Sequence, residues 1–313
     1  MSIFHKFRFN NRALFKPKIS IEQPMIKIGT IKEIWRYPVK GMAGESIESC
    51  HIDQHGLEGD RQFAVRDVKR NEIQSCKFRP NLLSCIATYN TDNAANIDQA
   101  PVSLNFPDGQ IFNSGVTAEI NQKISELLGH ESILETLQPD SDNDLYKRFK
   151  AKNHNWLQEL KDTFTREPGE SLPDFSDLPQ DFIDYVTLPG TFFLVSPCHI
   201  ITTATMDHFK KNHPDSDWDI RRFRPNILIE TTEGISGLVE QEWLGKTLHI
   251  DNTSIKCMSA APRCGAVTRK QQTFGFDKSM LRTIVNEADQ NLGIYGDIST
   301  QALINVGTDV YLS

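Results

Sequence analysis

The chain has 313 residues, 38% of them hydrophobic and 24% charged, which is the usage of an ordinary globular protein with one large or two modest domains. Its net charge of −7 argues against broad nucleic-acid binding, because that activity needs a basic face. The apolar runs are all shorter than the roughly 18 residues that a helix needs to cross a bilayer, so no transmembrane segment is expected.

The first 25 residues are basic and rich in phenylalanine. Residues 1–20 carry five Lys or Arg side chains and four Phe side chains but no acid. No long apolar stretch follows, so the segment is not typical of a secretory signal. We predict a disordered basic tail over residues 1–25, with an organelle transit peptide as the alternative.

The chain contains six cysteines, without a C-x-x-C pair or the spacing of a zinc finger. This scatter is typical of reduced thiols in a cytosol-like compartment. We therefore expect a cytoplasmic protein, and an organelle is the alternative location if the basic segment is a targeting signal.

Short strands separated by turn residues dominate the region from residue 26 onward. Residues 102–112 are predicted to form a hairpin that turns at 107–109. Residues 117–129 are predicted to form a helix with an apolar face, which Thr117 caps and Gly129 ends. Strands at this spacing indicate a small barrel or sandwich over residues 26–137.

Residues 138–185 are rich in Asp, Pro and Ser, and we interpret them as an irregular linker with one helix near 156–160. Order returns over residues 186–313. Strands are predicted at 191–197, 226–230, 292–299 and 302–312, a hairpin at 246–259, and helices at 204–213 and 277–290. The pattern lacks the strand–helix alternation of a Rossmann fold, so the expected class is mostly β with some α.

An acidic loop has the opening spacing of a calcium site at Asp215, Asp217 and Asp219. Its sixth position is Ile220, where the turn needs glycine, and its twelfth is Asn226, where a bidentate glutamate is needed. We interpret the loop as a solvated acidic surface.

Cys198 and His199 place a thiol beside an imidazole. Neighbours on a strand point to opposite faces, so this pair is more typical of structure than of catalysis. A pairing of His199 with Cys264 across the fold stays open.

Two arginine-bearing turns favour binding of an anion. Residues 221–226, "RRFRPN", place three arginines before an apolar strand, and Pro225 fixes the backbone behind Arg224. Residues 56–63, "GLEGDRQF", carry Arg61 after two glycines that permit tight turns. A solvated basic turn is the plainer interpretation of residues 221–226, and bidentate phosphate binding is the sharper one.

The stretch 261–269, "APRCGAVTR", places Cys264 in a turn between Pro262 and Gly265, directly after Arg263. A loop cysteine near a fixed positive charge is a candidate thiolate, and thiolates act as nucleophiles or as ligands of soft metals. With no C-x-x-C pair, thiols alone cannot build a closed structural metal site. Cys264 could instead supply one thiolate to a metal whose other ligands come from a cofactor.

Five segments occur in the order found in MOSC-domain proteins, and over residues 26–313 the chain resembles that family. The segments are "WRYPVKGM", "GLEGDRQFAV", "RRFRPNILIE", "APRCGAVT" and "LGIYGDI…INVGTDVYL". The resemblance implies a MOSC-type β-barrel over 186–313, preceded by a smaller N-terminal β-barrel-like module over 26–137.

The resemblance also implies a molybdenum–molybdopterin cofactor, with the molybdenum bound by Cys264 as the catalytic residue. Amidoxime-reducing members of the family reduce small N-hydroxylated compounds at such a site. The residues that match the family's cofactor contacts are Lys40, Gly41, Arg61, Gly190, Thr191, Arg224, Asn226, Pro262, Arg263 and Tyr295.

The sequence departs from the family pattern in three places. No Asp-Pro pair follows Cys264, glycine stands at Gly41 where many members have serine, and no ferredoxin domain follows the barrel region. Electrons are therefore expected from a separate protein of flavin, cytochrome or ferredoxin type. The leading hypothesis is a reductase of N–O compounds. The alternatives are a carrier or transferase that holds sulfur or cofactor on Cys264, and a metal-free module that binds an anion.

Overall fold

The computed structural model describes residues 24–91, 97, 100–115, 117–152, 154–164, 166, 169, 172, 175–176, 178–193 and 195–313. Most of the predicted basic tail, residues 1–23, therefore lies outside the described residues. Among the described residues, no helix combines the length and apolar character that a membrane crossing requires.

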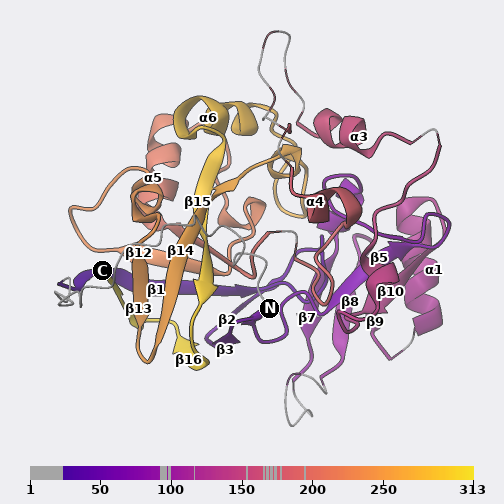
Figure 1. The fold of residues 1–313 in the computed structure, drawn as a ribbon, viewed down its shortest axis with the longest axis horizontal. Helices are drawn as coiled ribbons and strands as arrows, with labels where there is room; N and C mark the ends of the chain where they lie inside the picture. The colour runs from indigo at the N-terminus through magenta and orange to yellow at the C-terminus, as the bar shows by residue number, and fades with distance from the viewer. Residues whose placement is uncertain are drawn as a thin grey trace, which may run out of the picture.

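A closed barrel of seven strands forms the larger part of the molecule (Figure 1). Pairing between its first and last strands closes the barrel, and one neighbouring pair, β11 with β12, is parallel. In order around the barrel the strands are β12 (Ile227–Thr231), β11 (Cys198–Thr202), β15 (Asn291–Ile298), β14 (Thr253–Pro262), β13 (Thr247–Ile250), β17 (Asp309–Leu312) and β1 (Ile26–Arg36). Their inward-facing aliphatic side chains form the main core.

Strands from both halves of the sequence build this barrel. β1 lies at the start of the predicted N-terminal module, yet it pairs with β12 and β17. β2 (Glu45–Ile47) pairs with β1, and β3 (Ser49–Asp53) pairs with β16 (Ala302–Asn305) and with β4 (Gly56–Leu57). The division at 26–137, 138–185 and 186–313 stays a prediction.

Two small sheets and a helix form the rest of the N-terminal region, at the right of Figure 1. One sheet contains β10 (Ser132–Thr136), β5 (Phe63–Asp67) and β6 (Glu72–Ile73), and the other contains β7 (Ile86–Tyr89), β8 (Val102–Asn105) and β9 (Ile111–Asn113). Helix α1 (Thr117–Leu128) buries Ile120 and Ile124 in a core shared with both sheets. Its neighbour is a 3-10 turn, η2 (Pro80–Ser84).

Helices cover one end of the barrel. α5 (Thr203–Asn212) and α6 (Ser279–Ala288) lie together in Figure 1 and share a second core with Trp218. Short 3-10 turns connect the strands there, namely η4 (Ile220–Arg222), η5 (Val239–Trp243) and η6 (Gly265–Thr268). The segment 138–185 contains α2 (Asn143–Tyr146), α3 (Trp156–Asp162) and α4 (Gln180–Asp184).

The predicted fold class, mostly β with a MOSC-type barrel, is confirmed, as are both hairpins and the long helices. The strand predicted at 191–197 is wrong, because β11 begins only at Cys198. Before it, the amide of Thr191 donates to the carbonyl of Leu188, and Nζ of Lys40 donates to the carbonyl of Phe192. A short apolar run does not by itself distinguish a strand from a buried turn.

The last predicted strand, 302–312, is two strands in different sheets. β16 pairs with β3, whereas β17 pairs with β1 and β13. Gly307 turns the chain between them with a φ of 87°, a conformation that glycine adopts without strain, and its amide donates to the carbonyl of Ile31 at 2.7 Å.

Candidate functional site

Cys264 lies where the barrel strand β14 ends and η6 begins. It is a free, half-buried cysteine, whereas Cys50, Cys85, Cys198 and Cys257 are buried. Burial raises the pKa of the Cys85 and Cys257 thiols to about 12, so both are inert at neutral pH. The structure thus places Cys264 in the accessible turn that the sequence predicts.

Arg263 fastens this turn to the barrel. Its side chain is 7% exposed, and Nε donates to the carbonyls of Ala261 and Leu292 at 3.1 and 3.0 Å. Nη1 donates to the carbonyl of Phe223 at 3.0 Å. The Arg263 amide donates to the Gln290 carbonyl, and Nε2 of Gln290 donates back to the Arg263 carbonyl, each at 2.8 Å. The Arg263 guanidinium is therefore used in hydrogen bonds within the protein, and these bonds fix the backbone next to Cys264.

His199 faces Arg263 and not Cys264. Its Nε2 lies 2.5 Å from Nη2 of Arg263, and its Nδ1 lies 3.4 Å from the carbonyl of Arg224. Burial, reinforced by the charge of Arg263, holds the pKa of His199 well below its ordinary value. A neutral imidazole that accepts from Arg263 fits this geometry, so His199 supports the turn and is not paired with the thiol here. Tyr295 on β15 packs against this ring, with the centroids 5.4 Å apart.

Two arginines lie on the ring of Tyr37. The guanidinium carbons of Arg224 and Arg61 are 4.3 and 5.2 Å from its centroid. Both arginines have left-handed backbone conformations, with φ of 56° and 52°, which non-glycine residues rarely adopt. Such conformations carry strain, and the surrounding structure has to hold them in place.

Asp60 and Asn226 hold these arginines in place. Arg61 forms an ion pair with the buried Asp60, whose other carboxylate oxygen accepts from the amide of Tyr37 at 2.7 Å. Asn226 is 1% exposed, and its Nδ2 donates to Asp60 at 2.9 Å, while its Oδ1 accepts from the amide of His199 at 3.1 Å. The Asn226 side chain thus positions the site from inside the protein.

Lys40 brings the N-terminal region to the same place. Its Nζ donates to the carbonyl of Phe192 at 2.7 Å, which ties it to the turn that contains Gly190 and Thr191. Burial first, and then the positive charge of Arg61, lower the pKa of Lys40 to about 7. Gly190 has a φ of 75°, the left-handed backbone that favours glycine.

Cys76 and Lys77 also belong to this site, and the sequence did not single them out. Burial lowers the pKa of Lys77 and raises that of Cys76, and an electrostatic interaction with Cys264 contributes to the pKa of each group. Gly41 lies against them, since a Cβ there would be 3.2 Å from the amide nitrogen of Cys76. Their sequence signal is a Cys-Lys pair in the turn that follows the short strand β6 (Glu72–Ile73).

The site has more positive charge than its own acids neutralise. It contains four basic side chains, Lys40, Arg61, Lys77 and Arg224, of which Lys40 is only partly protonated at neutral pH, and Asp60 pairs with Arg61. Nη1 of Arg224 donates to the carbonyl of Met42, but its buried Nη2 has no hydrogen-bond partner among the described residues. Unpaired buried cations are costly, so these residues fit a bound anion. The thiols of Cys264 and Cys76 add soft donors beside it.

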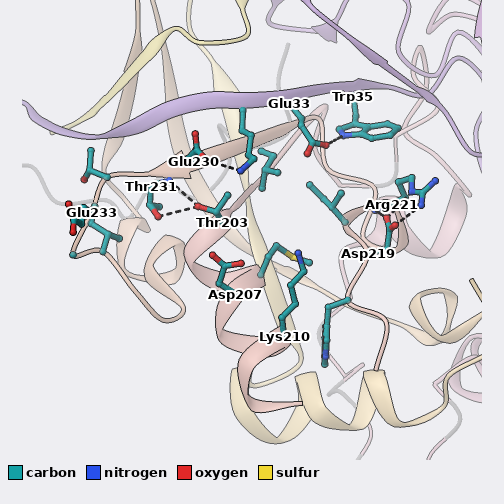
Figure 2. Close-up of a pocket in the computed structure, with 18 residues that line it drawn as sticks. Glu33, Trp35, Thr203, Asp207, Lys210, Asp219, Arg221, Glu230, Thr231 and Glu233 are labelled. Atoms are coloured by element: carbon teal, nitrogen blue, oxygen red, sulfur yellow. Dashed lines mark hydrogen bonds and ion pairs between the residues drawn. The ribbon is translucent and has the colours of Figure 1, made fainter. Parts of the chain in front are cut away.

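A cavity lies away from Cys264, between β1, β12 and α5 (Figure 2). Its volume is about 670 Å³, and its walls carry ion pairs between Lys32 and Glu230 and between Arg221 and Asp219. Cys264 and the predicted cofactor contacts do not line it. Size alone therefore does not locate the chemistry of this protein.

The fold and this thiol beside a cation cluster define a MOSC-type β-barrel protein. Residues 189–311 match the model of the MOSC domain, and residues 28–131 match that of the MOSC N-terminal beta barrel domain. The two regions together cover most of the chain, which therefore belongs to the MOSC-domain family.

Mitochondrial amidoxime reducing component 2 from Bos taurus is 23% identical to this chain over 308 residues, which cover 91% of this chain and 83% of that protein. Among solved structures, the YuaD protein from Bacillus subtilis matches 92% of this chain and 98% of its own, with 7% identity and a TM-score of 0.39. YiiM from Geobacillus stearothermophilus matches 38% of this chain and 54% of its own, with 12% identity and a TM-score of 0.29.

Proposed function

We propose that this protein is a molybdenum-cofactor oxidoreductase that reduces small N-hydroxylated compounds. The observation that carries the proposal is the buried Nη2 of Arg224, which has no hydrogen-bond partner among the described residues and belongs to a cluster of basic side chains that interacts electrostatically with Cys264. The family supports a function related to this cofactor, and the Bos taurus relative is named for amidoxime reduction.

The cations would hold the phosphate of the cofactor. Arg224 offers a free N–H for a charge-assisted hydrogen bond, and Lys40 and Arg61 would add positive charge from the N-terminal region. Gly41 and the turn with Gly190 and Thr191 would bring backbone close to the pterin. Pro262, Arg263, Asn226 and Tyr295 would shape the site from β14, β12 and β15.

Cys264 would complete the ligand set of the metal. A dithiolene supplies two sulfurs, and a cysteine thiolate is the soft protein ligand that matches them. The two hydrogen bonds between Arg263 and Gln290 fix the backbone next to this thiol. When bound, the cofactor would supply the two-electron chemistry that cleaves an N–O bond.

Reduction of an N-hydroxylated compound to the amine consumes two electrons and two protons and releases water. The sequence carries no flavin fingerprint, haem motif or iron–sulfur cysteine set. We therefore propose a separate electron-donor protein of flavin, cytochrome or ferredoxin type.

The test is turnover by protein purified from a host that makes the cofactor, after its molybdenum content has been measured. We expect no reaction with an N-hydroxylated substrate alone and repeated turnover once a low-potential artificial reductant is added. Cys264→Ala should abolish that turnover.

Loaded protein that turns over no N–O substrate under strong reductant would contradict the reductase proposal. If that protein instead passes sulfur or cofactor to an acceptor, it is a carrier or transferase that uses Cys264. If protein from such a host contains no molybdenum, the cofactor proposal itself is wrong.

We propose a cytoplasmic location. The alternative is an organelle, to which the basic residues 1–25 would direct the protein. A fluorescent fusion to the C-terminus, compared with one that lacks residues 1–25, distinguishes the two. Organelle fluorescence that depends on those residues would contradict the cytoplasmic proposal.

A further inference from the structure

A second, smaller cavity lies between the end of β1 and the loop that follows Cys264. Its volume is about 210 Å³, and it is lined by Trp35, Tyr37, Gln271, Phe274 and Arg221, together with parts of the segment 43–46. Trp35 and Arg221 also border the larger cavity, and Figure 2 shows them at the same end of it. The proposed molybdenum site does not account for this space.

Three aromatic residues, Trp35, Tyr37 and Phe274, line this smaller cavity. Trp35 and Tyr37 are stacked, with centroids 6.5 Å apart and planes at 20°. Phe274 is buried between two guanidinium groups, with Arg222 4.2 Å and Arg221 5.2 Å from its ring centroid. Together the three aromatic side chains give the cavity an apolar lining, which suits an aromatic ligand.

Gln271 supplies a buried polar group to the lining of this cavity. Its side chain is 4% exposed, and its Nε2 has no hydrogen-bond partner among the described residues. The backbone of Gln271 is fixed, since its amide donates to the carbonyl of Phe274 at 3.0 Å. A buried amide donor without an acceptor is rare in folded proteins, and a ligand that offers an acceptor would satisfy it.

The loop that carries Gln271 is already organised. Arg222 donates to the carbonyls of Val267, Arg269 and Gly275 at 3.3, 3.2 and 2.9 Å. Gln272 donates from its Nε2 to the carbonyl of Ser84 at 3.2 Å, which ties the loop to the N-terminal region. Because these walls are already fixed, the protein loses little conformational entropy when a ligand binds.

The charge of the cavity favours a neutral ligand. Of the described residues that line it, Arg221 alone is charged, and Asp219 accepts from that guanidinium through Nε at 2.8 Å and Nη2 at 2.5 Å. Nη2 of Arg221 also donates to Thr273 at 3.1 Å. An anionic ligand would have to compete with Asp219 for the same donors.

We propose that this cavity binds a small, neutral, planar aromatic compound whose hydrogen-bond acceptor takes the Nε2–H of Gln271. The volume suits a single ring with a short substituent. Tyr37 lines the cavity and also carries Arg61 and Arg224, so the ligand would lie beside the cation cluster. The proposal does not depend on molybdenum, because every residue that it uses is in place without the cofactor.

The test is titration of the cofactor-free full chain with nicotinamide, a neutral ring with a carbonyl acceptor, by calorimetry and by amide and indole NMR shifts. We expect saturable binding at millimolar concentrations or below, with a shift of the Trp35 indole N–H and none of the barrel-core Trp243. Gln271→Met should weaken binding about tenfold, as expected for the loss of one hydrogen bond to a neutral partner. Gln301→Met, at an exposed glutamine outside this cavity, is the matched control.

Cyclohexanecarboxamide keeps the carbonyl but is not flat, and it should bind more weakly than nicotinamide. If Gln271→Met does not fold, the NMR shift of the Trp35 indole N–H and the comparison of the two ligands still test the proposal on the unmodified chain. No saturable binding of nicotinamide, equal affinity in Gln271→Met, or equal affinity for cyclohexanecarboxamide would each overturn the proposal. These outcomes are separate from failure of the proposed reductase activity, since the titration uses no cofactor or reductant.

Discussion

Arg224 lies with its guanidinium carbon 4.3 Å from the ring centroid of Tyr37, whose hydroxyl donates to the carbonyl of Pro225 at 3.0 Å. The ring thus supports the arginine and also holds the backbone next to it. Nη2 of Arg224 is buried and has no hydrogen-bond partner in the part of the chain that the structure describes, which is why we propose that it binds an anion.

Arg224→Ala should weaken retention of the cofactor. One charge-assisted hydrogen bond contributes about 1.5–3 kcal/mol, which corresponds to roughly a tenfold to hundredfold loss of affinity. Arg224→Lys should restore only part of it, since an ammonium lacks the planar fork. The measurement is molybdenum content after extended dialysis.

Arg221→Ala is the control for this prediction, because Arg221 forms an ion pair with Asp219 outside the cation cluster. Its molybdenum content should be close to that of the unmodified protein. Equal losses at Arg221 and Arg224 would indicate a diffuse basic surface in place of a specific contact.

Cys264→Ala should abolish tight molybdenum retention while the protein stays folded, because a half-buried side chain in a turn adds little to the core. Cys85→Ala is the control, since Cys85 is a buried thiol of the N-terminal core. That variant should lose thermal stability and keep its molybdenum per folded molecule. Full molybdenum content in Cys264→Ala would show that the ligand has been assigned wrongly.

The parts of the site that a short motif encodes could be predicted from the sequence. Cys264 between proline and glycine, and Arg224 before Pro225, carry their own local signals. Lys77 could not be predicted in this way, because the docking of the β5–β6 hairpin brings it to a thiol that lies far along the chain. The turn at Gly190 was predicted as part of the site, but the strand expected just after it is absent because polar contacts of Lys40 and Thr191 hold a turn there.

A motif also does not say which way a side chain points. Arg263 stands beside Cys264 in the sequence, yet its guanidinium reaches back to Leu292 and His199. Asn226 follows the arginine turn, yet its amide bonds to Asp60. The expected strand pattern succeeds for the barrel because inward-facing side chains repeat every second residue, whereas the closure of β1 on β12 is a long-range pairing without a local signal.

The stability of the cofactor-free protein should rise between about pH 7 and pH 9, above which the buried thiols of Cys85 and Cys257, whose pKa burial raises to about 12, act in the opposite direction. Burial lowers the pKa of Lys40 to about 7 in the folded chain, against 10.5 for an ordinary lysine. In that window the unfolded chain binds the extra proton, so the free energy of unfolding increases with pH, by up to about 1.4 kcal/mol per pH unit for one group. Chemical denaturation at several pH values measures the slope.

Lys40→Met should flatten this slope, and Lys270→Met, at an exposed lysine, should leave it unchanged. An anion bound at the cluster favours the protonated lysine, so affinity for the cofactor should fall as pH rises above about 7. An identical pH slope in Lys40→Met and in the unmodified chain would mean that Lys40 keeps an ordinary pKa in the folded protein.

Gly265→Ala should damage the site through the backbone. A Cβ at this position would lie 1.8 Å from the carbonyl oxygen of Thr163, so either the turn after Cys264 or the end of α3 has to move. Because both are main chain, the shift cannot be absorbed by rotation of a side chain, and we expect a loss of stability of about 1–3 kcal/mol.

Gly275→Ala, in the same loop, is the matched control, since a Cβ there meets nothing within 4 Å. Thermal unfolding and molybdenum content of the two variants, compared side by side, measure the effect. If Gly265→Ala matched Gly275→Ala in both, the close contact between the segment 138–185 and the Cys264 turn would not exist in solution.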